Sequence, residues 1–150
     1  MEISCIYMFY YLLETIPLTM LAMAFFRLDL KPAPILVTAA TQSLFLFVLK
    51  RLHTYFGTHT FILIFTLAFM IYLYRRENLI RAFAAAFFSM LILGFFDLVT
   101  LFLANYLWPQ LFGSKDYSSS INLLRVIPYE VIIAAVAIHI DKANRKGSYK

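Results

Sequence analysis

The sequence predicts an all-α fold, a bundle of helices that span a membrane. Hydrophobic residues make up 63% of the 150 residues and charged residues only 14%, whereas soluble domains average about 45–50% and about 25%. The apolar residues form long runs, close to the ~20 residues that one helical span requires. The runs do not alternate between apolar and polar residues as barrel strands would, and a helix satisfies its own backbone hydrogen bonds in lipid.

About five spans are expected, at residues 3–26, 34–49, 58–74, 79–107 and 121–140. Charge and proline end the first run at residues 27–32, because proline cannot continue a helix and charged groups avoid lipid. The pair Lys50-Arg51 ends the second run, and Arg75-Arg76-Glu77 ends the third.

The last two spans are limited by Trp108-Pro109 and by a polar loop at residues 113–120. The residues after 140 are polar and basic. We therefore expect one transmembrane domain over residues 1–140 and a basic cytoplasmic tail over residues 141–150.

Lysine and arginine predict the orientation of this bundle. Five spans divide the 13 basic residues into four on one side of the membrane and nine on the other. Because basic loops stay in the cytoplasm, the N-terminus is expected outside and the C-terminus inside a multi-pass protein of the cell membrane. The predicted cytoplasmic basic patch consists of Arg27, Lys31, Arg75, Arg76, Arg81, Lys142, Arg145, Lys146 and Lys150.

Three carboxylates fall inside predicted spans, namely Glu14, Asp97 and Glu130. An acidic group at the bilayer centre costs about 2.5–3.5 kcal/mol on insertion scales, so each should face protein or water. Each also lies near a proline or glycine, which disturbs the helix and frees backbone polar groups. Two interpretations stay open: a shared pocket for a ligand or proton, or protonated carboxyls that hydrogen-bond between helices.

Other polar residues extend this predicted intramembrane site. Arg125, at the outer end of the fifth span, is expected to pair with Glu130 or Asp97, and Gln42 is expected to hydrogen-bond across helices. A face of small residues on the fourth span favours close helix packing or a dimer contact; it consists of Ala82, Ala85, Ala86 and Ser89.

The segment that joins the second and third spans is expected to form an external hairpin with Gly57 and His59. His59 is expected to cap the third span, with the sensing of pH or a ligand as the alternative. His53, His59 and His139 have no metal-ligand spacing with each other or with Cys5. No phosphate-binding loop or nucleophile motif is present, so we expect no metal, no cofactor and no enzymatic activity.

Three segments resemble a known family: Leu13-Glu14-Thr15-Ile16-Pro17, residues 27–31, and Phe56-Gly57-Thr58-His59-Thr60. In these the chain is similar to the N-terminal multi-span sensor domain of GHKL-type sensor histidine kinases of Gram-positive bacteria. The resemblance covers most of residues 3–140 and implies a domain that reads an external cue. It implies a ligand or conformational site at Glu14, Pro17, Gly57 and His59. The phosphoacceptor histidine and the ATP-binding domain of those kinases are missing from the 150 residues, so a sensor-like module without kinase activity is expected.

Three functions are therefore expected from the sequence. The first is a non-enzymatic sensor-like or scaffold protein for signalling, which acts through a protein partner or as a homo-oligomer. The second is a membrane anchor that binds RNA or another polyanion at its basic cytoplasmic face, although orientation and anionic lipid account for the same charges. The third is a small proton-coupled transporter that uses Glu14.

Overall fold

The described residues of the computed structural model form five α-helices: α1 (Glu2–Phe25), α2 (Pro32–Arg51), α3 (Thr58–Arg75), α4 (Leu79–Phe112) and α5 (Ser119–Gly147). The structure describes the backbone of residues 2–51, 58–76, 78–112 and 119–147. It describes the side chains of residues 8–49, 60–74, 76, 78–103, 106 and 127–146. The predicted all-helical class is thus confirmed.

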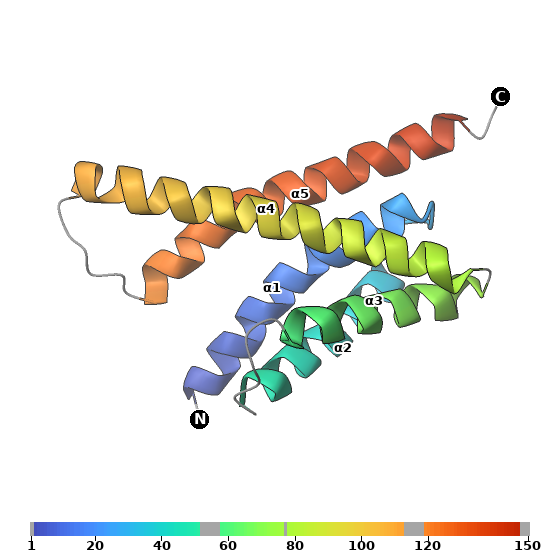
Figure 1. Cartoon of the computed structure of the whole chain (residues 1–150), viewed down its shortest axis with the longest axis horizontal. Helices are drawn as coiled ribbons and strands as arrows, with labels where there is room; N and C mark the ends of the chain where they lie inside the picture. Colours follow the sequence, from blue (N-terminus) through green and yellow to red (C-terminus); the bar gives the residue numbers. More distant parts are fainter. Residues whose placement is uncertain (1, 52–57, 77, 113–118, 148–150) are drawn as a thin grey trace.

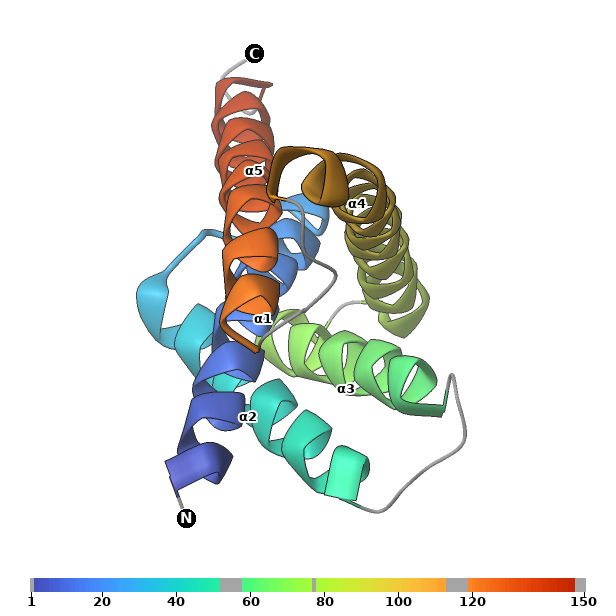
Figure 2. The ribbon, with the colours of Figure 1, turned by 90° about the vertical axis from the view of Figure 1, so that its left-hand side faces the viewer.

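Successive helices run in opposite directions, so the N-terminus lies at one end of the bundle and the C-terminus at the other (Figure 1). Helix α1 is central, because it contacts each of the other four helices. The view along the bundle shows α1 between α5, α4, α3 and α2 (Figure 2). The most extensive contacts of α1 are with α5 and α2, and α3 packs chiefly on α4.

Polar side chains lie inside the bundle and large apolar side chains lie on its surface, an arrangement that suits a lipid environment. Buried positions include polar residues such as Thr15, Thr38 and Gln42. Large apolar side chains face outward, for example Phe61 at 65% and Phe95 at 64% exposure. Because water would make such an arrangement costly, the outer surface fits the hydrocarbon of a membrane.

Three of the described helices are long and apolar enough to cross a membrane. The segments are Met8–Phe25 in α1, Pro32–Leu49 in α2 and Leu79–Leu103 in α4. Helix α3 contributes a shorter apolar segment, Thr60–Tyr74. These helices support association of the chain with a membrane.

The small-residue face predicted on α4 lies inside the bundle. Ala82, Ala86 and Ser89 have no exposed surface, and Ala85 is 8% exposed. The three alanines belong to a core cluster with residues of α1, α3 and α5. Small side chains allow helix backbones to approach closely, so this face positions α4 within the bundle.

Local backbone signals define the helix ends near the basic patch. Arg27 and Arg76 adopt the left-handed conformation, with φ of 56° and 53°, and this conformation ends α1 and α3. Asn78 caps α4, because its Oδ1 accepts hydrogen bonds from the N–H groups of Ile80 and Arg81 at 3.0 and 3.4 Å. Pro32 opens α2, where a missing N–H has no cost.

Two helices extend beyond the predicted spans. Helix α4 continues through Pro109 to Phe112, and α5 continues to Gly147. Residues 141–147, expected to begin a tail, are therefore helical. Two contacts explain the extension: Asp141 accepts a 3.0 Å hydrogen bond from Arg145 one turn later, and Arg145 and Lys146 complement the negative end of the helix dipole.

Candidate functional site

Glu130 is the most unusual polar group in the described part of the bundle. It lies on α5 with 7% of its surface exposed. Among the described residues, neither of its carboxyl oxygens has a hydrogen-bond partner. A buried polar group without a partner costs about 1–3 kcal/mol of stability, so this carboxyl weakens the fold.

Glu130 lines a cavity of about 220 Å³ between α1 and α5. The wall from α1 includes Leu13, Ile16 and Pro17, and the wall from α5 includes Ile127 and Val131. These walls are apolar. The cavity therefore suits an apolar group, with the Glu130 carboxyl as the one acidic function at its margin.

A proline of α1 lies in the wall of this cavity. Pro17 lies inside α1, which stays helical through it. Because Pro17 has no N–H, it cannot donate to the carbonyl of Leu13 one turn earlier. Leu13, Pro17 and Glu130 all line the cavity, so this turn of α1, in which one carbonyl lacks its helical donor, forms part of the wall.

The other two predicted carboxylates lie within electrostatic range of Glu130. The charge of Glu14 on α1 acts on it most strongly, followed by that of Asp97 on α4. Tyr129, 2% exposed, is within range of all three. Glu14, Asp97 and Glu130 are called the acidic cluster below. The helices α1, α4 and α5 thus bring together three groups that are up to 116 residues apart in sequence.

Gln42 does not line the cavity at Glu130. It is fully buried on α2, and neither amide atom has a hydrogen-bond partner among the described residues. The cavity at Glu130 is lined by α1 and α5, so Gln42 is not part of its wall. Thr15 instead forms a hydrogen bond between α1 and α2: its Oγ1 lies 3.1 Å from the carbonyl oxygen of Ala39.

Several predicted site residues lie outside the described part of the chain. These are Gly57 and Lys150, and the side chains of His59, Arg75 and Arg125. The expected pairing of Arg125 with an acidic residue and the external hairpin stay predictions.

The described members of the basic patch gather at one end of the bundle. Helices α1, α3 and α5 end there, and α2 and α4 begin there (Figure 1). The residues are Arg27, Lys31, Arg76, Arg81, Lys142, Arg145 and Lys146.

Part of this end is joined by contacts that the sequence did not reveal. Asn144 Nδ2 donates a 2.9 Å hydrogen bond to the carbonyl oxygen of Ala24 in the last turn of α1. Arg145 Nη2 lies 3.6 Å from Asp29 Oδ1 in the following loop. The sequence predicted the basic residues from their charge. It gave no local signal for Asn144, which caps a helix 120 residues earlier in the chain.

Within the described residues, no group of three or more His, Cys, Asp or Glu side chains is arranged to hold a metal ion. Comparisons of the chain with models of known protein families, with curated proteins and with solved structures found no match.

Proposed function

We propose that the chain is a non-enzymatic, multi-pass protein of the cell membrane, a sensor-like module that acts through a partner. In this proposal five helices span the bilayer, the N-terminus is outside, and the basic end faces the cytoplasm. The acidic cluster is the site at which a proton or ligand is sensed. The helix ends at the basic face carry the response.

The observation that carries this proposal is the unpartnered carboxyl of Glu130 beside an apolar cavity. An ionisable group inside a membrane is costly and usually marks a functional site. The cost of a buried charge without a partner is much larger than that of a neutral acid. Entry of a donor group or a change of protonation would therefore alter the energy of the α1–α5 interface.

A route from this site to the basic end follows from the same two helices. Helices α1 and α5 enclose the cavity and meet again where Asn144 binds the carbonyl of Ala24. A ligand that changes the spacing of the helices at the cavity would strain that contact. Arg145 and Asp29, the exposed ion pair beside it, would then present a changed surface to a cytoplasmic partner.

The test is purification from the native membrane with and without crosslinking, followed by identification of associated protein and nucleic acid. Wild-type protein is expected to retain a specific protein partner, and Glu130→Gln is expected to change the amount retained. Gln42→Leu is the matched control, because Gln42 is equally unpartnered but lies away from the cavity. Recovery of the bare protein alone, or equal recovery with both variants, would reject the sensor-like function.

Proton-coupled transport is the second candidate, favoured by the electrostatic proximity of Glu14 and Glu130 on neighbouring helices. Carboxyls within electrostatic range of each other titrate as a coupled pair, which is a property that proton transport requires. In proteoliposomes that contain a pH-sensitive dye, a transporter would conduct protons and Glu14→Gln would reduce the flux. Absence of flux in the wild type, or equal flux in the variant, would exclude this function.

The anchor for RNA or another polyanion stays a prediction of lower rank. Arg145 already contacts Asp29 and Asp141, which neutralises part of the positive charge that an RNA would need. Nucleic acid that co-purifies and dissociates steeply with salt would favour the anchor over the sensor-like function.

A further inference from the structure

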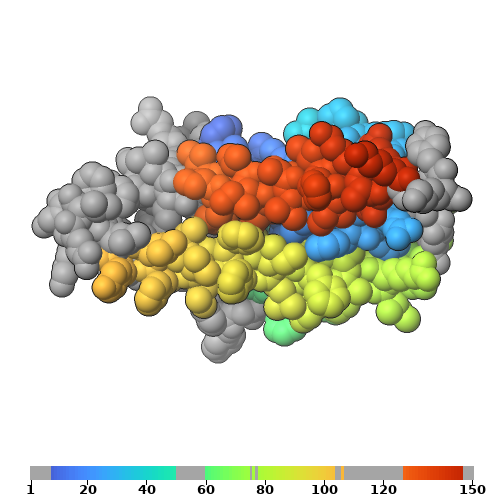
Figure 3. Space-filling model, turned by 90° about the horizontal axis from the view of Figure 1, so that it is seen from above, coloured from blue at the N-terminus to red at the C-terminus, as the bar shows by residue number. Residues whose placement is uncertain are grey.

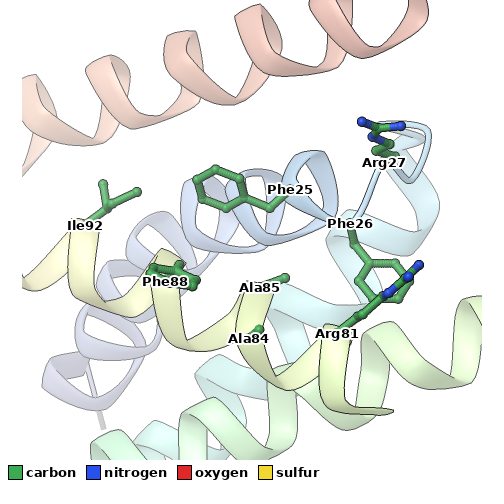
Figure 4. Close-up of a pocket in the computed structure, with 8 residues that line it drawn as sticks. All are labelled: Phe25, Phe26, Arg27, Arg81, Ala84, Ala85, Phe88 and Ile92. Atoms are coloured by element: carbon green, nitrogen blue, oxygen red, sulfur yellow. The ribbon is translucent and has the colours of Figure 1, made fainter. Parts of the chain in front are cut away.

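A second cavity lies between the end of α1 and the first turns of α4, away from the acidic cluster. Its volume is about 710 Å³, and it is lined by Phe25, Phe26 and Arg27 from the α1 end and by residues of α4 (Figure 4). We call it the α1–α4 cleft. No acidic side chain is present among the described residues that line it.

The contribution of α4 is a single stripe along the helix. Arg81, Ala84, Ala85, Phe88 and Ile92 line the cleft, and their spacing of three or four residues places them on one face. Eleven residues separate Arg81 from Ile92, which corresponds to about 16.5 Å at 1.5 Å per residue. The small side chains of the two alanines leave space beside the helix. Because arginine lines one end and phenylalanine and isoleucine line the rest, the cleft is cationic at one end and apolar along its length.

The two arginines come from different elements but reach the same end of the cleft. Arg27 lies two residues after the end of α1 in the left-handed conformation, and Arg81 lies in the first turn of α4; both side chains are exposed. Figure 4 shows both at the end of the cleft opposite Ile92. The cleft opens beside Phe25 and Phe88, whose side chains are 40% and 57% exposed, on the face where α1 is visible between α4 and α5 (Figure 3).

We propose that the α1–α4 cleft binds an anionic phospholipid of the surrounding bilayer. The phosphate lies between Arg27 and Arg81, and an acyl chain lies along Ala84, Phe88 and Ile92. Arginine donates paired hydrogen bonds to phosphate, and basic pockets between membrane helices on the cytoplasmic side bind anionic headgroups. A free phosphate would satisfy the arginines but leave the apolar length of the cleft empty, whereas a phospholipid matches both parts.

The test is native mass spectrometry of the full chain in detergent with equal amounts of phosphatidylglycerol and phosphatidylcholine. The wild type is expected to retain phosphatidylglycerol preferentially. Each arginine near the surface contributes about fivefold, so R27Q/R81Q should lower the preference by about twenty-fivefold. The matched control is K31Q/K142Q, which removes the same charge at the same end from two exposed residues that do not line the cleft; it should keep most of the preference.

Two further arms separate the cleft from general attraction of charge. Ala84→Leu fills the exposed hollow without a change of charge and should reduce lipid retention while the thermal midpoint of unfolding stays that of the wild type. Glycerol phosphate, a headgroup without acyl chains, should displace the lipid only weakly.

Four results would overturn the proposal: no preference in the wild type, an equal loss in K31Q/K142Q, unchanged retention in Ala84→Leu, or complete displacement by glycerol phosphate at the concentration of the lipid. The last result would identify a site for a free anion instead.

Discussion

Two kinds of polar residue lie inside the bundle, and their hydrogen bonds distinguish them. Hydroxyl groups donate to carbonyl oxygens of their own helix, as Thr66 does to Ile62 at 2.7 Å and Ser89 to Ala85 at 2.8 Å. These two hydroxyls are satisfied within their own helix. Four buried side chains have no such partner among the described residues, namely Thr19, Thr38, Gln42 and Glu130, and Glu130 is the one acid of these four.

Glu130→Leu is expected to stabilise the fold by about 1–3 kcal/mol, because it removes a buried polar group that forms no hydrogen bond. The measurement is the thermal midpoint of unfolding in detergent, with unfolding monitored by circular dichroism. Ile138→Val, at a residue 42% exposed on the same helix, is the control and should leave the midpoint nearly unchanged. A lower midpoint for Glu130→Leu would mean that the carboxyl stabilises the bundle.

At the scale of single helices, the alanine face of α4 allows this helix to pack closely in the bundle. Ala86 is fully buried and belongs to the core cluster, whereas Ala84, two residues earlier, is exposed. A single turn of this helix therefore supplies both a buried and an exposed alanine.

Ala86→Leu should destabilise the bundle by about 1–3 kcal/mol, because added methylene groups overpack a filled interface. Ala84→Leu should leave stability nearly unchanged. Thermal unfolding of the two variants in the same detergent checks this difference, and equal midpoints would contradict the assigned orientation of α4.

The last turns of α5 form a second element whose role depends on packing. Asn144 is only partly buried, but its amide donates to the carbonyl oxygen of Ala24 in the last turn of α1, which also accepts from the backbone N–H of Arg27 at 3.1 Å. The neighbouring pair of Arg145 with Asp29 is exposed at both ends, and such pairs contribute about 0–1 kcal/mol.

Asn144→Leu should therefore destabilise the chain by about 1 kcal/mol through the lost hydrogen bond, more than Asp29→Asn does. Chemical unfolding in mixed micelles measures both variants, with Lys146→Ala at an exposed position as the control. A larger effect of Asp29→Asn would assign the docking of α5 to the ion pair instead.

At the scale of the whole molecule, the alternating helices place both the N-terminus and the basic patch. The described basic residues share one end, opposite to the N-terminus (Figure 1). In the proposed topology the C-terminus therefore lies in the cytoplasm.

A green fluorescent protein fused after Lys150 is expected to fluoresce, and alkaline phosphatase fused at the same position is expected to stay inactive, because the positive-inside rule places this end in the cytoplasm. A fusion of each reporter before Met1 is the control and should give the opposite pattern. An active phosphatase at the C-terminus would contradict the orientation or the odd number of spans.

The helical class and the approximate helix limits followed from the sequence alone. Long apolar runs and the charged groups that end them, such as Lys50-Arg51, are local properties, and lipid leaves a helix as the natural structure for such runs. The same local rules placed the end of the fifth element at residue 140, whereas α5 continues to Gly147. The extension also carries Asn144, whose contact with α1 no local pattern encodes.

The sequence thus determined that the chain is helical, that its surface suits lipid, and that Glu14, Asp97 and Glu130 are costly residues which require an explanation. Only the tertiary structure brought these three together, left Glu130 without a partner, and opened the α1–α4 cleft beside Arg27 and Arg81. The physical reason is that composition and the length of an apolar run determine whether a single segment forms a helix. The partner of a buried side chain is instead decided by which other helix packs against it.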